Sequence, residues 1–400
     1  MRDLAPCLRP RELPLSAAQE RAWLREQTAL DPSLHTSALA IRIRGALDSG
    51  ALVAAFNQLA LRHEILRTVI DVAGARRIQL VTARPHLERR AVSAPSVRHA
   101  GAELDATLRM LVEPTFDLRE GPLFRAHLLR VTETDHALVL VVHHAVGDAR
   151  SLELLLAELA AHYRGEALPP PAVQYADVTM WLREWLDVPA EHAYWDARLL
   201  GAAPLALPTD RPRAASPSCR AASHPITLAG SRAQVAGAWH TVLARLAGQD
   251  ELVTAVPVTA RLAGMGELVG PFDACAPVRV ELAGAGSREI TRRVTTAIAE
   301  SRAHPHVPPI APLRAACILT DALPPAPSFG AARTERIAVV PSAIPFELAL
   351  VLRDGVGAIE FHADLFAQAT IETIATRLRA AIASAEPSTA LFAAAAASLP

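Results

Sequence analysis

The chain has 400 residues, enough for two or three domains at about 150 residues per domain. Its 40 Lys and Arg residues balance 41 Asp and Glu residues, which argues against a general nucleic-acid-binding protein, because such proteins carry a basic excess. Hydrophobic residues make up 51% of the chain, so it can build a large core, yet no apolar run approaches the roughly 18 residues of a membrane span.

The first part of the chain alternates between helical and strand patterns. Ser16 is placed to cap a helix within 14–30, and Asp48 to cap a helix that continues toward His63. Gly165 and the prolines at 169–171 end the last helix of this part. We predict strands over 39–43, 77–81, 123–131 and 137–142, and helices over 104–112 and 152–163.

The Pro-rich stretch is the predicted domain boundary, followed by helices over 174–200 and a loop over 204–225. Strands and helices then alternate over 251–257, 276–282, 289–299, 316–319, 349–352, 358–363 and 371–383, with Pro-rich loops at 305–312 and 323–327. We therefore expect an α+β protein with an N-terminal lobe over 1–170, linker helices and a loop over 171–215, and a C-terminal lobe over 216–400.

The segment 139–151 carries the clearest chemical pattern. An apolar strand ends at His143 and His144, a turn carries Gly147 and Asp148, and a helix follows. A histidine held at a strand end suits general-base chemistry, because its reference pKa lies near neutrality. The first amides of the following helix have no intrahelical acceptor and are candidates to stabilise an oxyanion. The alternative is a buried histidine pair bonded by the backbone, with Asp148 as the helix N-cap.

The sequence indicates neither a metal site nor a disulfide framework. The loop histidines His304 and His306 lack a Cys or a spaced acidic partner, so we expect no metal site. No Lys is present, which excludes Schiff-base, P-loop and kinase chemistry. Neither a zinc site nor a disulfide framework is expected, because no CxxC occurs and the four cysteines lie far apart: Cys7, Cys219, Cys275 and Cys317.

The sequence HHAVGDA at 143–149 resembles the HHxxxDG signature of the condensation domains of nonribosomal peptide synthetases, which belong to the chloramphenicol acetyltransferase-like superfamily. Other family elements follow in order along almost the whole chain. They are SAAQERAW at 16–23, GALD at 45–48, RHEILRT at 62–68, FDLREGPLFR at 116–125, YAD at 175–177, YW at 194–195, LPTDRP at 207–212, GQDELV at 248–253, PVTAR at 257–261, and LF at 365–366 with Thr370.

The resemblance implies two chloramphenicol acetyltransferase-like lobes in a V, with a central tunnel between them. Acyl or peptidyl carrier proteins would deliver 4'-phosphopantetheine thioesters, and a small amine or alcohol would act as acceptor, with no cofactor bound by the domain itself. His144 would be catalytic, taking or orienting the acceptor's proton. His143 would support it, and Asp148 would form a buried ion pair with Arg261 of the other lobe. We expect a cytoplasmic monomer that binds neither nucleic acid nor membrane.

The chain departs from the family pattern at several positions. Ala149 replaces the glycine of the signature, which adds a methyl group and restricts positive φ. Ala274 and Cys275 replace a family Asn and Thr and are candidates to line the tunnel; Cys275 is expected to be a small core residue rather than a nucleophile. The C-terminal lobe is shortened, with a helix pair compressed into 231–246 and a divergent loop at 304–310.

Three functions fit these observations. The first is carrier-dependent condensation that forms an amide or ester in natural-product biosynthesis. The second is an acyl-CoA-dependent O- or N-acyltransferase, which the RHEILRT, FDLREGPLFR and LPTDRP elements disfavour. The third is a catalytically silent condensation-like domain that recruits a partner enzyme; His144 argues against it, whereas Ala149 and Ala274 leave it open. No adenylation signature or carrier-protein motif is present, so we expect either a freestanding enzyme or a domain excised from a longer protein, and we favour the freestanding enzyme.

Overall fold

The computed structural model describes residues 4–10, 12–28, 31–73, 76–92, 100–112, 115–214, 219–308, 310–339 and 342–384. The chain divides into two compact units. The first comprises Met1–Val188, Ala260–Asp273 and Pro324–Ser342, and the second comprises Pro189–Thr259, Ala274–Leu323 and Ala343–Pro400. Neither unit is continuous in sequence. The predicted lobes at 1–170 and 216–400 would each be continuous, whereas Ala260–Asp273 and Pro324–Ser342 pack in the first unit.

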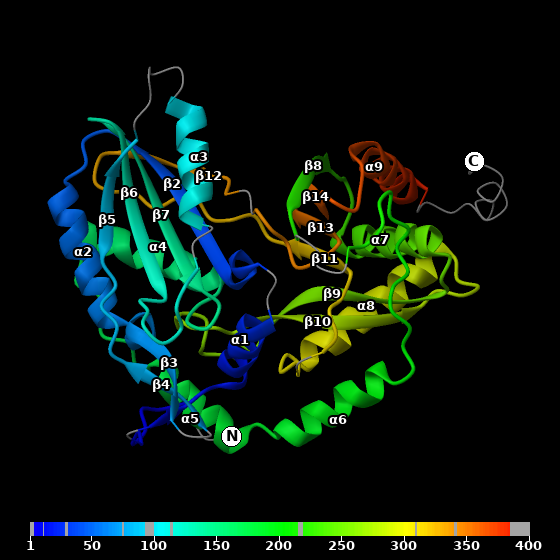
Figure 1. Cartoon of the computed structure of the whole chain (residues 1–400), viewed down its shortest axis with the longest axis horizontal. Helices are drawn as coiled ribbons and strands as arrows, with labels where there is room; N and C mark the ends of the chain where they lie inside the picture. Colours follow the sequence, from blue (N-terminus) through cyan, green and yellow to red (C-terminus); the bar gives the residue numbers. More distant parts are fainter. Residues whose placement is uncertain are drawn as a thin grey trace. The chain divides into compact units, whose positions relative to one another are not determined.

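The first unit is built on a five-stranded sheet with the order β12-β2-β7-β6-β5 (Figure 1). Its central strand is β7, which pairs antiparallel with both neighbours and is buried from His136 to His143. Both faces of β7 are covered, which explains its uninterrupted apolar run at 137–142. The strands are β2 (Thr36–Arg44), β5 (Leu87–Ala91), β6 (Phe124–Thr132), β7 (Asp135–His143) and β12 (Arg333–Ile337).

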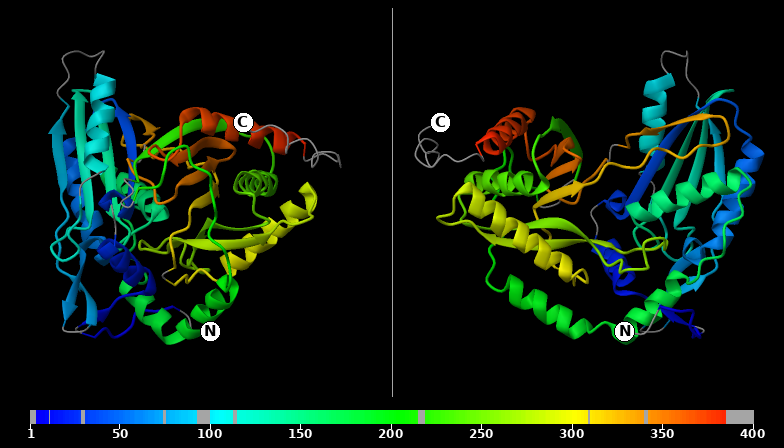
Figure 2. Two further views of the ribbon diagram at one scale, coloured as in Figure 1. Left: turned by 45° about the vertical axis from the view of Figure 1, so that its right-hand side comes forward. Right: turned by 180° about the vertical axis from the view of Figure 1, so that it is seen from behind.

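Helices α2 and α4 pack against each other and against this sheet, where Phe56 of α2 stacks on Phe124 of β6. Figure 2 shows α4 lying along the sheet. A smaller sheet has the order β1-β4-β3. The remaining elements of this unit are β1 (Leu13–Pro14), α1 (Ala17–Thr28), η1 (Pro32–His35), α2 (Ser49–Arg62), η2 (Glu64–Arg67), β3 (Thr68–Ala73), β4 (Arg76–Val81), α3 (Ala100–Val112), α4 (Ala149–Tyr163) and α5 (Tyr175–Trp185).

Side-chain caps begin the helices where the sequence predicts them. The Asp48 carboxylate accepts hydrogen bonds from the amides of Gly50 and Ala51, at 2.8 and 3.0 Å. Ser16 and Gln19 bond each other's backbone amides at the start of α1, at 2.9 and 3.2 Å. Each cap satisfies amides that have no acceptor within the helix.

The second unit contains a six-stranded sheet with the order β10-β9-β11-β13-β14-β8. Helix α7 packs against α8 and α9, and its Trp239 is fully buried in the core of the unit. The elements are α6 (Val188–Leu199), β8 (Ala221–Thr227), α7 (Arg232–Ala247), β9 (Glu251–Thr259), β10 (Asp273–Glu281), α8 (Ser287–Ala303), β11 (Ala315–Thr320), β13 (Leu348–Arg353), β14 (Val356–His362) and α9 (Gln368–Ala383).

Two local expectations differ from the structure. Strand β8 begins inside the predicted loop over 204–225, where it pairs antiparallel with β14. The predicted compressed helix pair at 231–246 is the single helix α7, which Ser231 caps by accepting a hydrogen bond from the amide of Gln234. Cys7, Cys219, Cys275 and Cys317 all lie within the described residues, and no disulfide joins them. Within the described residues, no helix is both long and apolar enough to cross a membrane.

Candidate active site

The segment 143–149 forms a tight turn between β7 and α4. The His144 amide donates to the carbonyl of His35 at 2.8 Å, and the amides of Val146 and Gly147 donate to the carbonyl of His143 at 2.9 and 3.2 Å. Gly147 permits a close approach, because a Cβ there would lie 2.9 Å from a methyl carbon of Val142. The turn therefore holds the His144 backbone at a defined place at the end of the central strand.

The His144 side chain lies beside the first residues of β2. Its Nε2 is 3.0 Å from the Ser37 hydroxyl, and the ring also bonds the backbone of Thr36. Burial, aided by His143, His35 and Arg25, lowers the pKa of His144 to about 3, against the opposing effect of the Thr36 backbone. The imidazole is therefore neutral at neutral pH, so one of its nitrogens is an acceptor.

His143 has a different role from its neighbour. It is 1% exposed, and its Nδ1 accepts a hydrogen bond from the Ala145 amide at 3.0 Å, while its Nε2 faces the Glu26 carboxylate at 3.3 Å. The alternative of a buried histidine bonded by the backbone thus describes His143. His144 is the half-buried member of the pair.

Asp148 is both a helix cap and an ion-pair partner. Its carboxylate accepts from the Ser151 amide and hydroxyl, both at 2.7 Å, and from the Phe272 amide at 3.0 Å. The implied pair with Arg261 is present: Nη2 lies 2.8 and 3.0 Å from the two carboxylate oxygens, and the side chains are 8% and 6% exposed for Arg261 and Asp148. However, Arg261 packs as part of the first unit, and the expectation that it belongs to the other lobe is wrong in this respect.

The segment 260–273 is held on the first unit at several points. Arg261 Nη1 donates to the carbonyls of Met265 and Leu268, and its guanidinium lies over the ring of Phe272 at 4.2 Å. Gly270 lies so close to Tyr175 that a Cβ there would be 2.1 Å from the ring. The buried Tyr175 hydroxyl donates to the carbonyl of Pro271 at 3.1 Å. Together with the bonds to Asp148, these contacts brace the start of α4.

Ser151 connects the same two segments. Its hydroxyl donates to Asp148 and lies 2.9 Å from the carbonyl and 3.0 Å from the amide nitrogen of Gly270. Ser151 is fully buried, so its hydroxyl relies on these protein groups rather than on water for its hydrogen bonds. The sequence pattern singled out Asp148 but not Ser151, because a Ser in the first turn of a helix is common.

Ala149 does not carry the backbone restriction that we expected. It is the first residue of α4, and the non-glycine residues with positive φ in the described ranges are Cys219 and Asp354. A glycine is therefore not needed there for its backbone conformation, and the substitution only adds one methyl group at an exposed position. The next residue, Arg150, is exposed and pairs with Glu267 at 3.0 Å.

The two other candidates, Ala274 and Cys275, lie on β10 in the second unit. Ala274 packs against the core of the second unit. Cys275 is half-buried and packs against a small apolar cluster of Ala255, Ala316, Phe346 and Ala349, which is the environment of a small core residue. Across the described ranges, no group of three or more His, Cys, Asp or Glu side chains is arranged to hold a metal ion.

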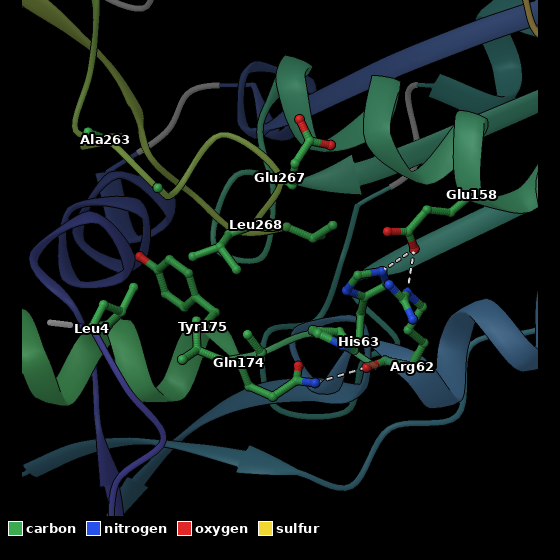
Figure 3. A pocket seen from close by; sticks show the side chains of 14 residues that line it. Leu4, Arg62, His63, Glu158, Gln174, Tyr175, Ala263, Glu267 and Leu268 are labelled. Atoms are coloured by element: carbon green, nitrogen blue, oxygen red, sulfur yellow. Dashed lines mark hydrogen bonds and ion pairs between the residues drawn. The ribbon is translucent and has the colours of Figure 1, made fainter. Parts of the chain in front are cut away.

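A cavity of about 580 Å³ lies in the first unit but is not lined by His144 (Figure 3). Its charged groups are already paired: Glu158 Oε2 lies 2.5 Å from His63 Nε2 and 2.9 Å from Arg62 Nε. Burial alone would raise the pKa of Glu158, but His63 and Arg62 outweigh it and lower that pKa. Gln174 in turn bonds the carbonyl of Arg62 at 3.0 Å. The first residues of the RHEILRT element therefore hold α2, α4 and the chain before α5 together.

A sequence model of the family described as "Condensation domain" matches residues 10–310. This chain belongs to the condensation-domain family. A component of the linear gramicidin synthase of Brevibacillus parabrevis is 33% identical over 76% of the chain, and malpibaldin synthetase of Mortierella alpina is 32% identical over 75%. The chain spans only 4% and 6% of the lengths of these two relatives.

Solved structures agree with this family. The X-domain from teicoplanin biosynthesis is 27% identical, with a TM-score of 0.82 over 96% of this chain and 97% of that one. The condensation domain of the monacolin K polyketide synthase MokA is 20% identical, with a TM-score of 0.77 over 94% and 98% of the two chains, and it supports the fold alone. The predicted α+β, chloramphenicol acetyltransferase-like fold is thus confirmed.

Proposed function

We propose that this condensation domain joins an acyl or aminoacyl thioester, carried on the 4'-phosphopantetheine arm of a carrier protein, to an amine or hydroxyl acceptor. The acceptor atom attacks the thioester carbonyl, so that an amide or ester bond forms and the carbon–sulfur bond breaks. The acceptor loses one proton and the leaving thiolate gains one. The observation that carries the proposal is the half-buried, neutral imidazole of His144 at the end of β7.

The low pKa of His144 defines its part in this reaction. An imidazole whose pKa lies near 3 carries one N–H and one acceptor nitrogen at neutral pH, and it does not hold a second proton there. His144 therefore orients the acceptor's N–H or O–H toward the thioester and assists proton transfer only as the bond forms. The Ser37 hydroxyl lies 3.0 Å from His144 Nε2. The amine or hydroxyl of the acceptor substrate would share this contact with Nε2 or replace Ser37 in it.

The test is product formation from a donor-loaded carrier protein and a free or carrier-bound amine, followed by mass spectrometry. We expect His144→Ala to lower turnover by about 100-fold or more, as for other positioned proton-transfer groups. His86→Ala is the matched control, because the His86 side chain is 69% exposed and contacts Glu88 at the surface. Product formation by His144→Ala at the control rate would contradict the proposal. Equal turnover with an acyl-CoA donor would instead favour the acyltransferase alternative.

A second candidate is a silent recruiting domain. The X-domain from teicoplanin biosynthesis is similar along nearly the whole chain, and a structure of that X-domain in complex with OxyB has been solved. The recruiting function predicts no product with any donor and a partner enzyme that binds wild type and His144→Ala equally. A pull-down against enzymes encoded beside this chain, run with both variants, separates it from condensation.

A further inference from the structure

One carboxylate lies against two histidines that both contact the turn carrying His144. Glu26, on α1, has Oε2 3.3 Å from His143 Nε2 and 3.8 Å from His35 Nε2. The His35 carbonyl accepts the His144 amide at 2.8 Å. Burial opposes ionisation of Glu26, but the hydrogen bond from His143 and the nearby His143 and His35 rings outweigh it and lower its pKa. Glu26 is therefore a carboxylate, which can only accept hydrogen bonds.

The His143 residue bonds three successive amides of the turn. Its carbonyl accepts from Val146 and Gly147, and its Nδ1 accepts from Ala145 at 3.0 Å. A backbone amide can only donate, so Nδ1 must be unprotonated, and a neutral His143 carries its proton on Nε2. That is the nitrogen which faces Glu26.

The opposite tautomer, or the imidazolium, would place an N–H on Nδ1 against the N–H of Ala145. Two donors cannot bond each other, so the turn or the ring would have to move. The ring has little room to do so, because it is 1% exposed, with Phe116 at 5.8 Å and His35 at 6.1 Å between ring centroids. The protonation state of His143 and the shape of the turn are thus coupled.

We propose that Glu26 is a positioning residue, which fixes the Nε2-protonated tautomer of His143 and, through the Ala145 amide, holds the turn that presents His144. The charged and titratable groups around this assembly are Glu26 and Arg25 from α1, Asp31 and His35 at η1, and His144 from the turn itself. The tautomer is independent of the proposed function, whereas the effect on turnover rests on it.

Two variants of Glu26 distinguish the effect of its hydrogen-bond acceptor from the effect of its volume. Glu26→Gln keeps a carbonyl acceptor at the same length, whereas Glu26→Leu keeps similar volume without one. Glu20→Leu on the same helix is the control, because Glu20 has a side chain 42% exposed and lies 4.0 Å from Arg183 at the surface. We expect turnover to fall by about 10- to 100-fold in Glu26→Leu with KM little changed, because a small displacement of a reacting group has effects of this size. Glu26→Gln should retain most of the activity.

The tautomer is read directly from nitrogen chemical shifts of ¹⁵N-histidine-labelled protein, with the His143 signals assigned by their loss in His143→Asn. The expected wild-type pattern is an unprotonated Nδ1 and a protonated Nε2, kept in Glu26→Gln and replaced by a mixture in Glu26→Leu. A protonated Nδ1 in the wild type would overturn the proposal, as would an unchanged tautomer in a folded Glu26→Leu. If Glu26→Leu does not fold, the wild-type and Glu26→Gln spectra still test the assigned tautomer of His143. If no condensation activity is found, the spectra test the tautomer without an activity measurement.

Discussion

Removing the Asp148 carboxylate should destabilise the first unit more than any other single truncation at the turn. Asp148→Ala removes four kinds of acceptor contact: the amide and hydroxyl of Ser151, the amide of Phe272 and the guanidinium of Arg261. It leaves the Arg261 side chain, 8% exposed, without its countercharge. Breaking a buried pair from one side costs about 3–5 kcal/mol, and loss of an N-cap costs about 1 kcal/mol. Because the ion pair and the N-cap depend on the same carboxylate, their costs are not fully additive, and we expect Asp148→Ala to lower the free energy of unfolding by about 4 kcal/mol.

The reverse truncation should cost less. Arg261→Met keeps an apolar stem over Phe272 and removes the charge, while Asp148 retains three donors from Ser151 and Phe272. We expect about 2–3 kcal/mol for Arg261→Met. The double variant should be more stable than the sum of the single changes predicts, by about 1–3 kcal/mol, since neither charge is then left alone. Asp148→Asn is the matched control, because its amide oxygen can still cap α4.

Urea unfolding gives the free energies, and hydrogen exchange read by mass spectrometry shows where the protein opens. The Asp148→Ala variant should lose protection in the first turn of α4 and over 260–273, with β13 and β14 of the second unit unchanged. Strict additivity of the two single variants, or Asp148→Ala with wild-type stability, would refute the claim that this pair braces the turn.

Two further predictions concern packing and pH. Gly270→Ala should destabilise the first unit by about 1–3 kcal/mol, because its Cβ would lie 2.1 Å from the Tyr175 ring. Gly266→Ala is the control and should be tolerated, because no atom lies within 4 Å of a Cβ at that position. Equal urea midpoints for the two variants would contradict this prediction. Burial lowers the pKa of His240 to about 4, below its unfolded value near 6.5, so the unfolded chain takes up the proton first as pH falls. The stability present above pH 6.5 is therefore lost as the pH falls toward 4, by about 2 kcal/mol at pH 5. Urea unfolding at pH 7.5 and 5.0 should show a smaller difference in His240→Gln, and an identical difference in both proteins would show that His240 is not responsible.

The strands that sequence patterns did not reveal share one place in the fold. They are β1, β3, β5, β8 and β12, and each lies at an edge of its sheet. β5 reads LERRA and β12 reads RTERI, and most of their residues are exposed or half-buried. An edge strand is paired on one side only and often carries charges that discourage further pairing. Apolar periodicity is therefore weak in β5 and β12, although it was sufficient for the buried β7.

Local sequence patterns were sufficient to predict the apolar run of β7, the two histidines at its end, the Asp148 cap and the helix that follows. Each depends on neighbours within a few residues. Glu26 and Ser37 were found only in the tertiary structure, because they lie more than 100 residues from their partners in the turn. Arg261 is also more than 100 residues from Asp148, but the family resemblance implied this pair, and the structure contains it. Sheet register decides that Ser37 lies opposite Val142 and so beside His144. Nothing in the local pattern of residues 260–273 shows that this segment returns to the first unit, because its packing depends on the shapes of Tyr175 and Phe272 and on a buried charge elsewhere in the chain.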